Sequence, residues 1–134
     1  MFNNTYRFSV HAVILNDENK ILQLKQTYTD KRWGLPGGAV EPGETINETI
    51  VRECKEEIGV DIQVVSLTGF YYHKKFNAQV GIFLCKINSE DDIVLSEEHS
   101  EYNWFELSDL TEIQQLRVGD AINYDGVVKA RSFN

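Results

Sequence analysis

Alternating apolar and polar positions predict most of the strands in this chain. From Tyr6 to Ile14 the alternation is that of a strand with one buried face. The same pattern, bounded by turn signals, predicts five strands at residues 6–14, 21–24, 62–72, 78–87 and 102–105. In the fourth of these, apolar side chains occupy both faces, which indicates a strand inside a sheet that is covered on both sides.

A helical period appears in the middle of the chain. An apolar residue recurs at every fourth position, at Ile46, Ile50, Cys54 and Ile58. Thr45 precedes this stripe as an N-cap, Glu48 completes a capping box, and Gly59 stands where a helix-ending glycine belongs. These signals predict a helix at about 46–58. Two further helices are predicted at 108–115 and 120–131, the second interrupted by Gly126.

The segments between these elements are polar or rich in glycine. Residues 27–32 and the acidic stretch 88–100 are predicted as loops. Residues 33–38 hold three glycines and a proline, which exclude a regular helix and allow close backbone approach. Few helices among mixed strands predict one domain over residues 1–134, an α/β/α sandwich of the α+β type with a mixed sheet.

Composition and charge narrow the functional classes. The net charge of −8 argues against a protein that coats nucleic acid, because such binding needs a basic face. It is compatible with a small phosphorylated substrate, since a bound divalent cation reverses the local charge of an acidic site. No apolar run approaches the ~20 residues of a membrane helix. We expect a cytosolic protein whose cysteines, Cys54 and Cys85, are buried without a disulfide.

Three carboxylates of the predicted helix break the rules of helix stability. Glu53, Glu56 and Glu57 project beside the apolar stripe as one patch, and each like-charge pair costs about 0.2–0.5 kcal/mol. Glu56 and Glu57 also lie in the last turn, where the helix dipole favours cations. One interpretation is a solvated acidic face. The other is a Mg²⁺ site, in which Arg52 holds a neighbouring glutamate or a loop carbonyl in place.

The segment from Gly38 to Val60 resembles the Nudix box of the Nudix hydrolase family. The positions that match by identity are Gly38, Glu44, Arg52, Glu53, Glu56, Glu57 and Gly59. Cys54 replaces the usual aliphatic residue. The resemblance extends to Trp33–Gly37 before the box and to Trp104-Phe105 after an acidic loop. It implies an α/β/α fold with the box as loop-helix-loop, and hydrolysis of a nucleoside diphosphate linked to another group.

The resemblance also implies roles for individual residues. Metal ligands would be Glu53, Glu56, Glu57 and the Gly37 carbonyl, with Mg²⁺ as cofactor and Mn²⁺ as a substitute. Glu44 would orient the ligands, and Arg52 would hold them together. A water molecule would attack phosphorus and a glutamate would take its proton.

The proton acceptor stays open between the box and the downstream loop. In that loop we favour Glu98, as a supplementary ligand or base, over its neighbours Glu97, His99 and Glu101. The predicted catalytic set is therefore Arg52, Glu53, Glu56 and Glu98. His11 and His73 are expected to be ordinary strand or loop residues.

Substrate contacts and alternatives complete the prediction. Arg7, Lys25 and Arg32 are candidates for phosphate binding. Four aromatic residues are candidates for base stacking, although aromatic residues in strands more often belong to the core: Tyr28, Phe70, Tyr71 and Tyr72. The main alternative is an inactive Nudix-like domain that senses a nucleotide. An isomerase of isopentenyl diphosphate would require a longer chain. The protein is expected to act as a monomer or homodimer.

Overall fold

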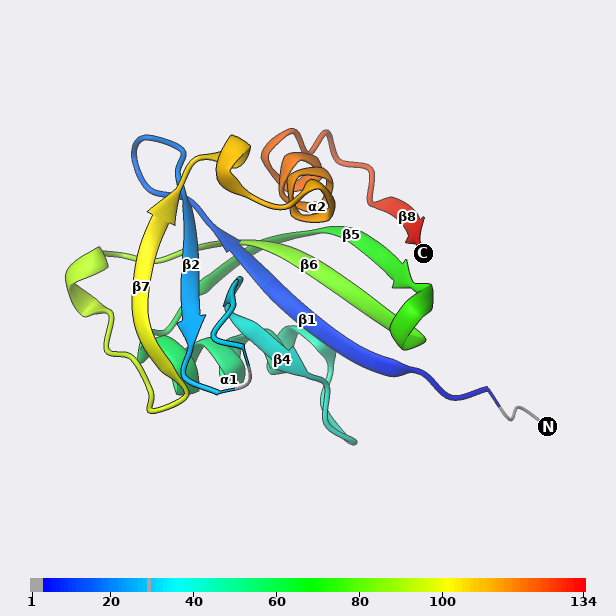
Figure 1. The fold of residues 1–134 in the computed structure, drawn as a ribbon, viewed down its shortest axis with the longest axis horizontal. Coiled ribbons are helices and arrows are strands. Elements are labelled where there is room, and N and C mark those ends of the chain that lie inside the picture. The colour runs from blue at the N-terminus through cyan, green and yellow to red at the C-terminus, as the bar shows by residue number, and fades with distance from the viewer. Residues whose placement is uncertain (1–3, 29) are drawn as a thin grey trace.

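The computed structural model describes residues 4–28 and 30–134. They form two α-helices, eight strands and three short 3₁₀ turns (Figure 1). The strands are β1 (Arg7–Ile14), β2 (Ile21–Gln26), β3 (Trp33–Gly34), β4 (Gly37–Ala39), β5 (Gln63–His73), β6 (Ala78–Lys86), β7 (His99–Phe105) and β8 (Lys129–Phe133). The helices are α1 (Ile46–Ile58) and α2 (Glu112–Ile122), and the 3₁₀ turns are η1 (Lys74–Phe76), η2 (Glu90–Asp92) and η3 (Leu107–Asp109).

The strands form two sheets, and the larger one is mixed as predicted. Its order is β4-β1-β6-β5-β8, with β1 parallel to β6, β5 parallel to β8, and the other neighbours antiparallel. The smaller sheet is antiparallel, in the order β3-β2-β7. In Figure 1 the two sheets diverge from the end where β1 turns into β2.

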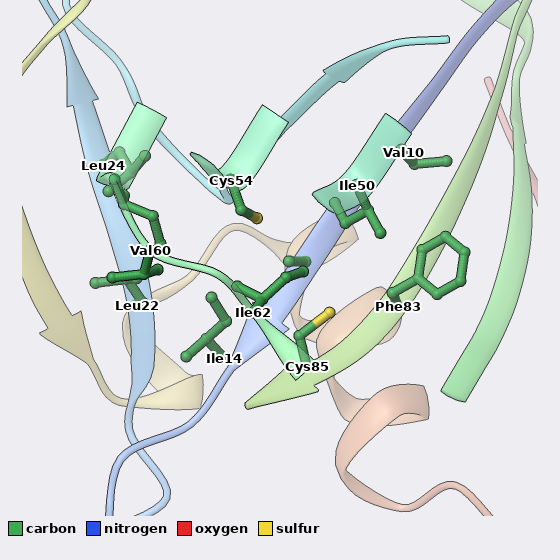
Figure 2. Packing of buried hydrophobic residues seen from close by; sticks show 12 residues of the cluster. Val10, Ile14, Leu22, Leu24, Ile50, Cys54, Val60, Ile62, Phe83 and Cys85 are labelled. Atoms are coloured by element: carbon green, nitrogen blue, oxygen red, sulfur yellow. The ribbon is translucent and has the colours of Figure 1, made fainter. Parts of the chain in front are cut away.

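Helix α1 covers one face of the larger sheet. Its stripe residues Ile50, Cys54 and Ile58 have no exposed surface. Figure 2 shows Ile50 and Cys54 pointing from α1 into the cluster that they share with strand residues such as Ile14 and Phe83. Both cysteines are free and buried, as expected. The apolar stripe therefore fixes how α1 is rotated, and with it the direction of the neighbouring carboxylates.

Helix α2 covers the opposite face, which completes the three layers (Figure 1). Val118 and Ala121 are fully buried there with Val13 of β1 and Ile82 of β6. Along β6, even-numbered residues such as Ile82 face α2, and odd-numbered ones such as Phe83 face α1. Strand β6 is thus covered on both sides, as its sequence predicts. Among the described residues, neither helix is long and apolar enough to cross a membrane.

Both ends of α1 are closed as the sequence predicts. The Thr45 hydroxyl accepts a hydrogen bond from the Glu48 amide, and the Glu48 carboxylate accepts one from the Thr45 amide. Gly59 ends the helix in the left-handed conformation, at φ 71°. The amides of Val94 and Ser96 then donate to carbonyls of the last turn, at 2.9 and 3.0 Å. These bonds hold the acidic loop against the carboxylate end of α1.

The C-terminal region differs from the prediction. The helices predicted at 108–115 and 120–131 are wrong, because a single helix, α2, lies at 112–122 with Thr111 as its N-cap. Gly126 adopts φ 94° in the turn that follows, and residues 129–133 pair with β5 as strand β8. Pairing with a strand about sixty residues earlier overrides the local helical pattern.

Asp120 of α2 ties β8 to the core. Its carboxylate accepts two bonds from the guanidinium of Arg131, both at 2.9 Å, and one from the Tyr71 hydroxyl at 2.8 Å. Arg131 lowers the pKa of Asp120, with a smaller contribution from the Tyr71 hydroxyl. Because Tyr71 is fully buried, this network gives its hydroxyl the partner that burial requires.

Candidate active site

The glycine segment before α1 places the backbone directly against the helix carboxylates. The Gly37 amide donates to the Glu57 carboxylate at 2.8 Å. Gly37 has φ 152°, and an added Cβ would lie 2.1 Å from the Val10 carbonyl oxygen. At Gly38 an added Cβ would lie 2.5 Å from the carboxylate carbon of Glu53. A side chain at Gly37 would therefore collide with the backbone of β1, and a side chain at Gly38 would displace the carboxylate of Glu53.

Arg52 lies at the centre of the carboxylate cluster. Its guanidinium donates to both oxygens of Glu44, at 2.6 and 2.9 Å, and to Glu53 at 3.1 Å. It also donates to the Ala39 carbonyl at 3.2 Å and more weakly to Glu56 at 3.3 Å. Arg52 thus contacts three glutamates and a loop carbonyl, whereas the sequence predicts that it holds a neighbouring glutamate or a loop carbonyl.

The carboxylates differ strongly in environment. Arg52, together with bonds from the Glu41 amide and the Thr49 hydroxyl, lowers the pKa of Glu44 to about 2. Burial raises the pKa of Glu57 to about 8, and the charges of Glu53, Glu98 and Glu56 add to that effect. The bond from Gly37 opposes the shift without cancelling it.

The pKa of Glu53 is raised for the same reasons as that of Glu57, but Glu53 is less buried. Burial raises its pKa, Arg52 opposes that change, and the charges of Glu56 and Glu98 raise the pKa further. Its side chain is 16% exposed, whereas that of Glu56 is 58% exposed. Exposure to solvent therefore increases across the cluster from Glu57 through Glu53 to Glu56.

A divalent cation fits this donor set. Burial and the charges of neighbouring glutamates favour protonation of Glu57 and Glu53, and among the described residues only Glu53 has a positive partner, Arg52. A hard cation with oxygen ligands would supply the missing positive charge. Within residues 4–28 and 30–134, no group of three or more histidine, cysteine, aspartate or glutamate side chains is arranged so that it could hold a metal ion. The carboxylates instead line one face of α1, with Glu56 turned to Arg52.

The acidic loop brings Glu98 to the same end of α1. Its carbonyl accepts from the Thr27 amide at 2.9 Å, and its charge contributes to the raised pKa values of Glu57 and Glu53. Of the other three loop candidates, Glu97 is exposed, Glu101 is engaged elsewhere and His99 is partly buried. Glu101 pairs with Lys25 at 3.4 Å, and burial lowers the pKa of His99.

The three basic candidates are not brought together. Lys25 lies over the Trp33 ring, 5.9 Å from its centre, and pairs with Glu101, and Arg32 forms an ion pair with Asp30. Arg7 instead lines a cavity at the start of β1.

The aromatic candidates also separate. Tyr71 belongs to the core, and Phe70 and Tyr72 pack edge-on against Phe8 and Tyr6. Tyr28 lies nearest the carboxylates: burial raises its pKa, and so do the charges of Glu98, Glu57 and Glu53. Of the four, Tyr28 is therefore the one placed beside the acidic cluster.

Arg117 of α2 is a further candidate that is not predicted from the sequence. It is only 8% exposed, and its guanidinium donates to His73 and to Gln114, both at 3.1 Å. Burial lowers the pKa of Arg117 to about 10, and burial together with Arg117 lowers the pKa of His11 to about 4. No local sequence pattern predicts that Arg117 is buried, because its burial depends on strands distant in sequence.

Comparisons with known proteins agree with this geometry. The model of the NUDIX domain matches residues 5–125. The bis(5'-nucleosyl)-tetraphosphatase [asymmetrical] of Caenorhabditis elegans is 34% identical over an alignment of 100 residues that covers 70% of this chain and 72% of the relative. The putative 8-oxo-dGTP diphosphatase of Bacillus subtilis is 30% identical over 99 residues, 74% of this chain and 66% of the relative.

Solved structures lead to the same family. The C. elegans Ap4A hydrolase, in a binary complex, superimposes with a TM-score of 0.70 at 27% identity, covering 85% of this chain and 93% of that one. The matched region includes the glycine segment, the helix and the acidic loop described above. On the family model and the relatives together, the chain belongs to the Nudix family of hydrolases.

Proposed function

We propose that the chain is a Mg²⁺-dependent pyrophosphohydrolase whose metal site is formed by Glu53, Glu56 and Glu57. Nudix hydrolases generally need a divalent metal ion. The observation that carries the proposal is the buried Glu57 beside the half-buried Glu53: among the described residues Glu57 has no positive partner, and Glu53 has only Arg52. Magnesium suits all-oxygen sites that use few carboxylates and leave room for phosphate oxygens.

The substrate proposed is a nucleoside diphosphate linked to another group. The relatives support this class, since one is named for dinucleoside tetraphosphates and another for 8-oxo-dGTP. Cleavage would take place at a phosphoanhydride bond beside the carboxylate cluster. Tyr28, next to that cluster and 47% exposed, is the aromatic residue best placed to contact the substrate there.

Each residue of the box has a proposed task. Glu53, Glu56 and Glu57, with the Gly37 carbonyl, would hold the cation, which supplies charge neutralisation at phosphate oxygens and acidifies water. Arg52 fixes Glu44 and Glu53 relative to the Ala39 carbonyl. Glu98 would accept the proton of the attacking water, because it faces the cluster from the opposing loop.

A panel of substrates with Mg²⁺ and with Mn²⁺ tests the proposal. It comprises nucleoside triphosphates, nucleotide sugars, ADP-ribose and dinucleoside polyphosphates. We expect turnover of at least one class, its loss in Glu57→Gln, and its retention in Glu48→Gln. The Glu48 variant is a matched control on the same helix, because glutamine also completes a capping box. Absence of turnover by the wild type across the panel would favour the nucleotide-sensing alternative.

A further inference from the structure

A second site lies on the α2 face of the sheet, next to strand β4. It is a cavity of about 520 Å³, within the range of small-molecule sites. Its walls come from the start of β1, the end of β4, the η1 turn, the start of β6, and α2. The charged and aromatic side chains that line it are Arg7, Phe8, His73, Phe76 and Arg117.

Arg117 is the feature of this cavity that the fold leaves unexplained. Of the five arginines, three form ion pairs, whereas the described residues supply no carboxylate partner to Arg7 or Arg117. Arg117 is 8% exposed, and its Nε has no hydrogen-bond partner in the described part of the chain. Burying a charge without a counter-charge is strongly unfavourable, so a buried guanidinium lining a cavity indicates an anionic ligand.

Neighbouring residues hold Arg117 ready for such a ligand. His73 and Gln114 accept one bond each from the two terminal nitrogens of the guanidinium. His73 is neutral in this role, because burial and the charge of Arg117 lower its pKa. Two of the five N–H donors are thereby used to orient the planar group. The remaining donors include the Nε N–H, which has no partner among the described residues, and a planar guanidinium suits a phosphate group.

The cavity adjoins the carboxylate cluster across β4. Gly38 contacts Glu53, the Ala39 carbonyl accepts from Arg52, and Ala39 and Val40 line the cavity. A molecule extending from the box carboxylates past β4 would enter the cavity that Arg117 lines. On the rim, Phe8 and Phe76 are 36% and 54% exposed, which provides aromatic surface beside the arginines. Aromatic surface with arginine is the chemistry that recognises a nucleotide.

We propose that this cavity receives a second nucleotide of the substrate, the one beyond the cleaved diphosphate, and that Arg117 binds its phosphate. The proposal rests on the proposed function, and it makes Arg117 a specificity-determining residue. Substrates with a nucleotide at both ends gain a contact that substrates with a neutral far end lack. A nucleotide sugar is an example of the second kind.

The test uses Arg117→Met, which keeps the apolar stem and removes charge and donors. Arg131→Met is the control, since Arg131 is paired with Asp120. We expect Arg117→Met to be at least as heat-stable as the wild type, because it removes an uncompensated buried charge. Arg131→Met should be less stable. If Arg117→Met loses as much stability as the control, Arg117 has a structural role and the proposal is overturned.

Binding is measured by calorimetry with AMP and metal-free protein, which requires no turnover. We expect the wild type to bind AMP, and Arg117→Met to bind it at least about tenfold more weakly. Adenosine should bind both proteins equally weakly. No AMP binding by the wild type, or equal binding by both proteins, would overturn the proposal. This result is independent of whether the chain hydrolyses any substrate.

Kinetics then distinguish a substrate site from a separate effector site. For a dinucleoside polyphosphate, Arg117→Met should raise KM about tenfold and leave kcat unchanged. For a nucleotide sugar, both constants should stay at wild-type values. If AMP binds through Arg117 but does not compete with the dinucleoside polyphosphate, and KM is unchanged, the cavity binds an effector and the substrate assignment is wrong.

Discussion

Replacing Glu57 by glutamine should stabilise the metal-free protein while it removes activity. Glu57 is 6% exposed, and burial raises its pKa to about 8. Glutamine has nearly the same shape and keeps an oxygen that can accept the bond from the Gly37 amide. The substitution therefore removes a charge and little else. If Glu57 stabilised the metal-free fold, its replacement by glutamine would instead lower the free energy of unfolding.

The magnitude follows from the difference in pKa between the folded and unfolded chain. In the unfolded chain Glu57 titrates near its ordinary value of 4.5, and in the folded protein near 8. Below the lower value both states are protonated and the group has no effect. Between the two values only the unfolded chain is ionised, so the stability of the wild type falls as pH rises. At about 1.4 kcal/mol per pH unit, the loss is about 3 kcal/mol at pH 7 and about 5 kcal/mol above pH 8.

Urea denaturation in EDTA at pH 5, 7 and 8.5 measures this difference. Glu57→Gln should exceed the wild type by an amount that increases at each step, whereas Glu48→Gln should follow the wild type throughout. Adding Mg²⁺ should stabilise the wild type and not Glu57→Gln, because only the wild type keeps the full ligand set. A constant or reversed difference between pH 5 and 8.5 would show that Glu57 is not an uncompensated buried carboxylate.

Three further substitutions test other parts of the structure. Gly38→Ala places a methyl group 2.5 Å from the carboxylate carbon of Glu53 and should lower kcat/KM about a hundredfold. Gly119→Ala is the control: it has open space around it and should leave kcat/KM unchanged. Thr45→Ala removes the cap hydroxyl and should cost about 1 kcal/mol in urea denaturation, a loss that serine should restore. Asp120→Ala should lower the free energy of unfolding by about 2 kcal/mol at pH 7. Because the pKa of Asp120 is lowered in the folded protein, this loss should shrink as acid protonates the wild-type carboxylate. An unchanged loss in acid would contradict the role of the Asp120 charge.

Helix α1 could be predicted closely because its determinants are local. The apolar stripe, the capping box at Thr45 and the left-handed Gly59 all lie within the helix or beside it. The C-terminal region could not, because α2 and β8 depend on contacts between distant segments. Residues 129–133 become a strand only by pairing with β5, and the Asp120 network that secures them joins three separate elements.

The candidate site shows the same division between local and distant determinants. A helical wheel places Glu53, Glu56 and Glu57 on one side of α1, but it does not predict that their burial differs. The structure separates them, because the Gly37 segment and the acidic loop cover Glu57 and leave Glu56 in solvent. Their metal-binding role, like the roles of Arg52 and Glu98, stays a prediction.

The two buried groups of opposite charge are best understood together. Glu57 lies on the α1 side of β4 and Arg117 on the α2 side, and each is buried without a counter-charge in the described chain. They do not neutralise each other, so each weakens the ligand-free fold. A cation on one side and a phosphate on the other would relieve both costs at once. A metal complex of a phosphate-rich substrate carries both a cation and phosphate groups. Its binding would therefore compensate both buried charges and make the protein more stable than it is without ligand.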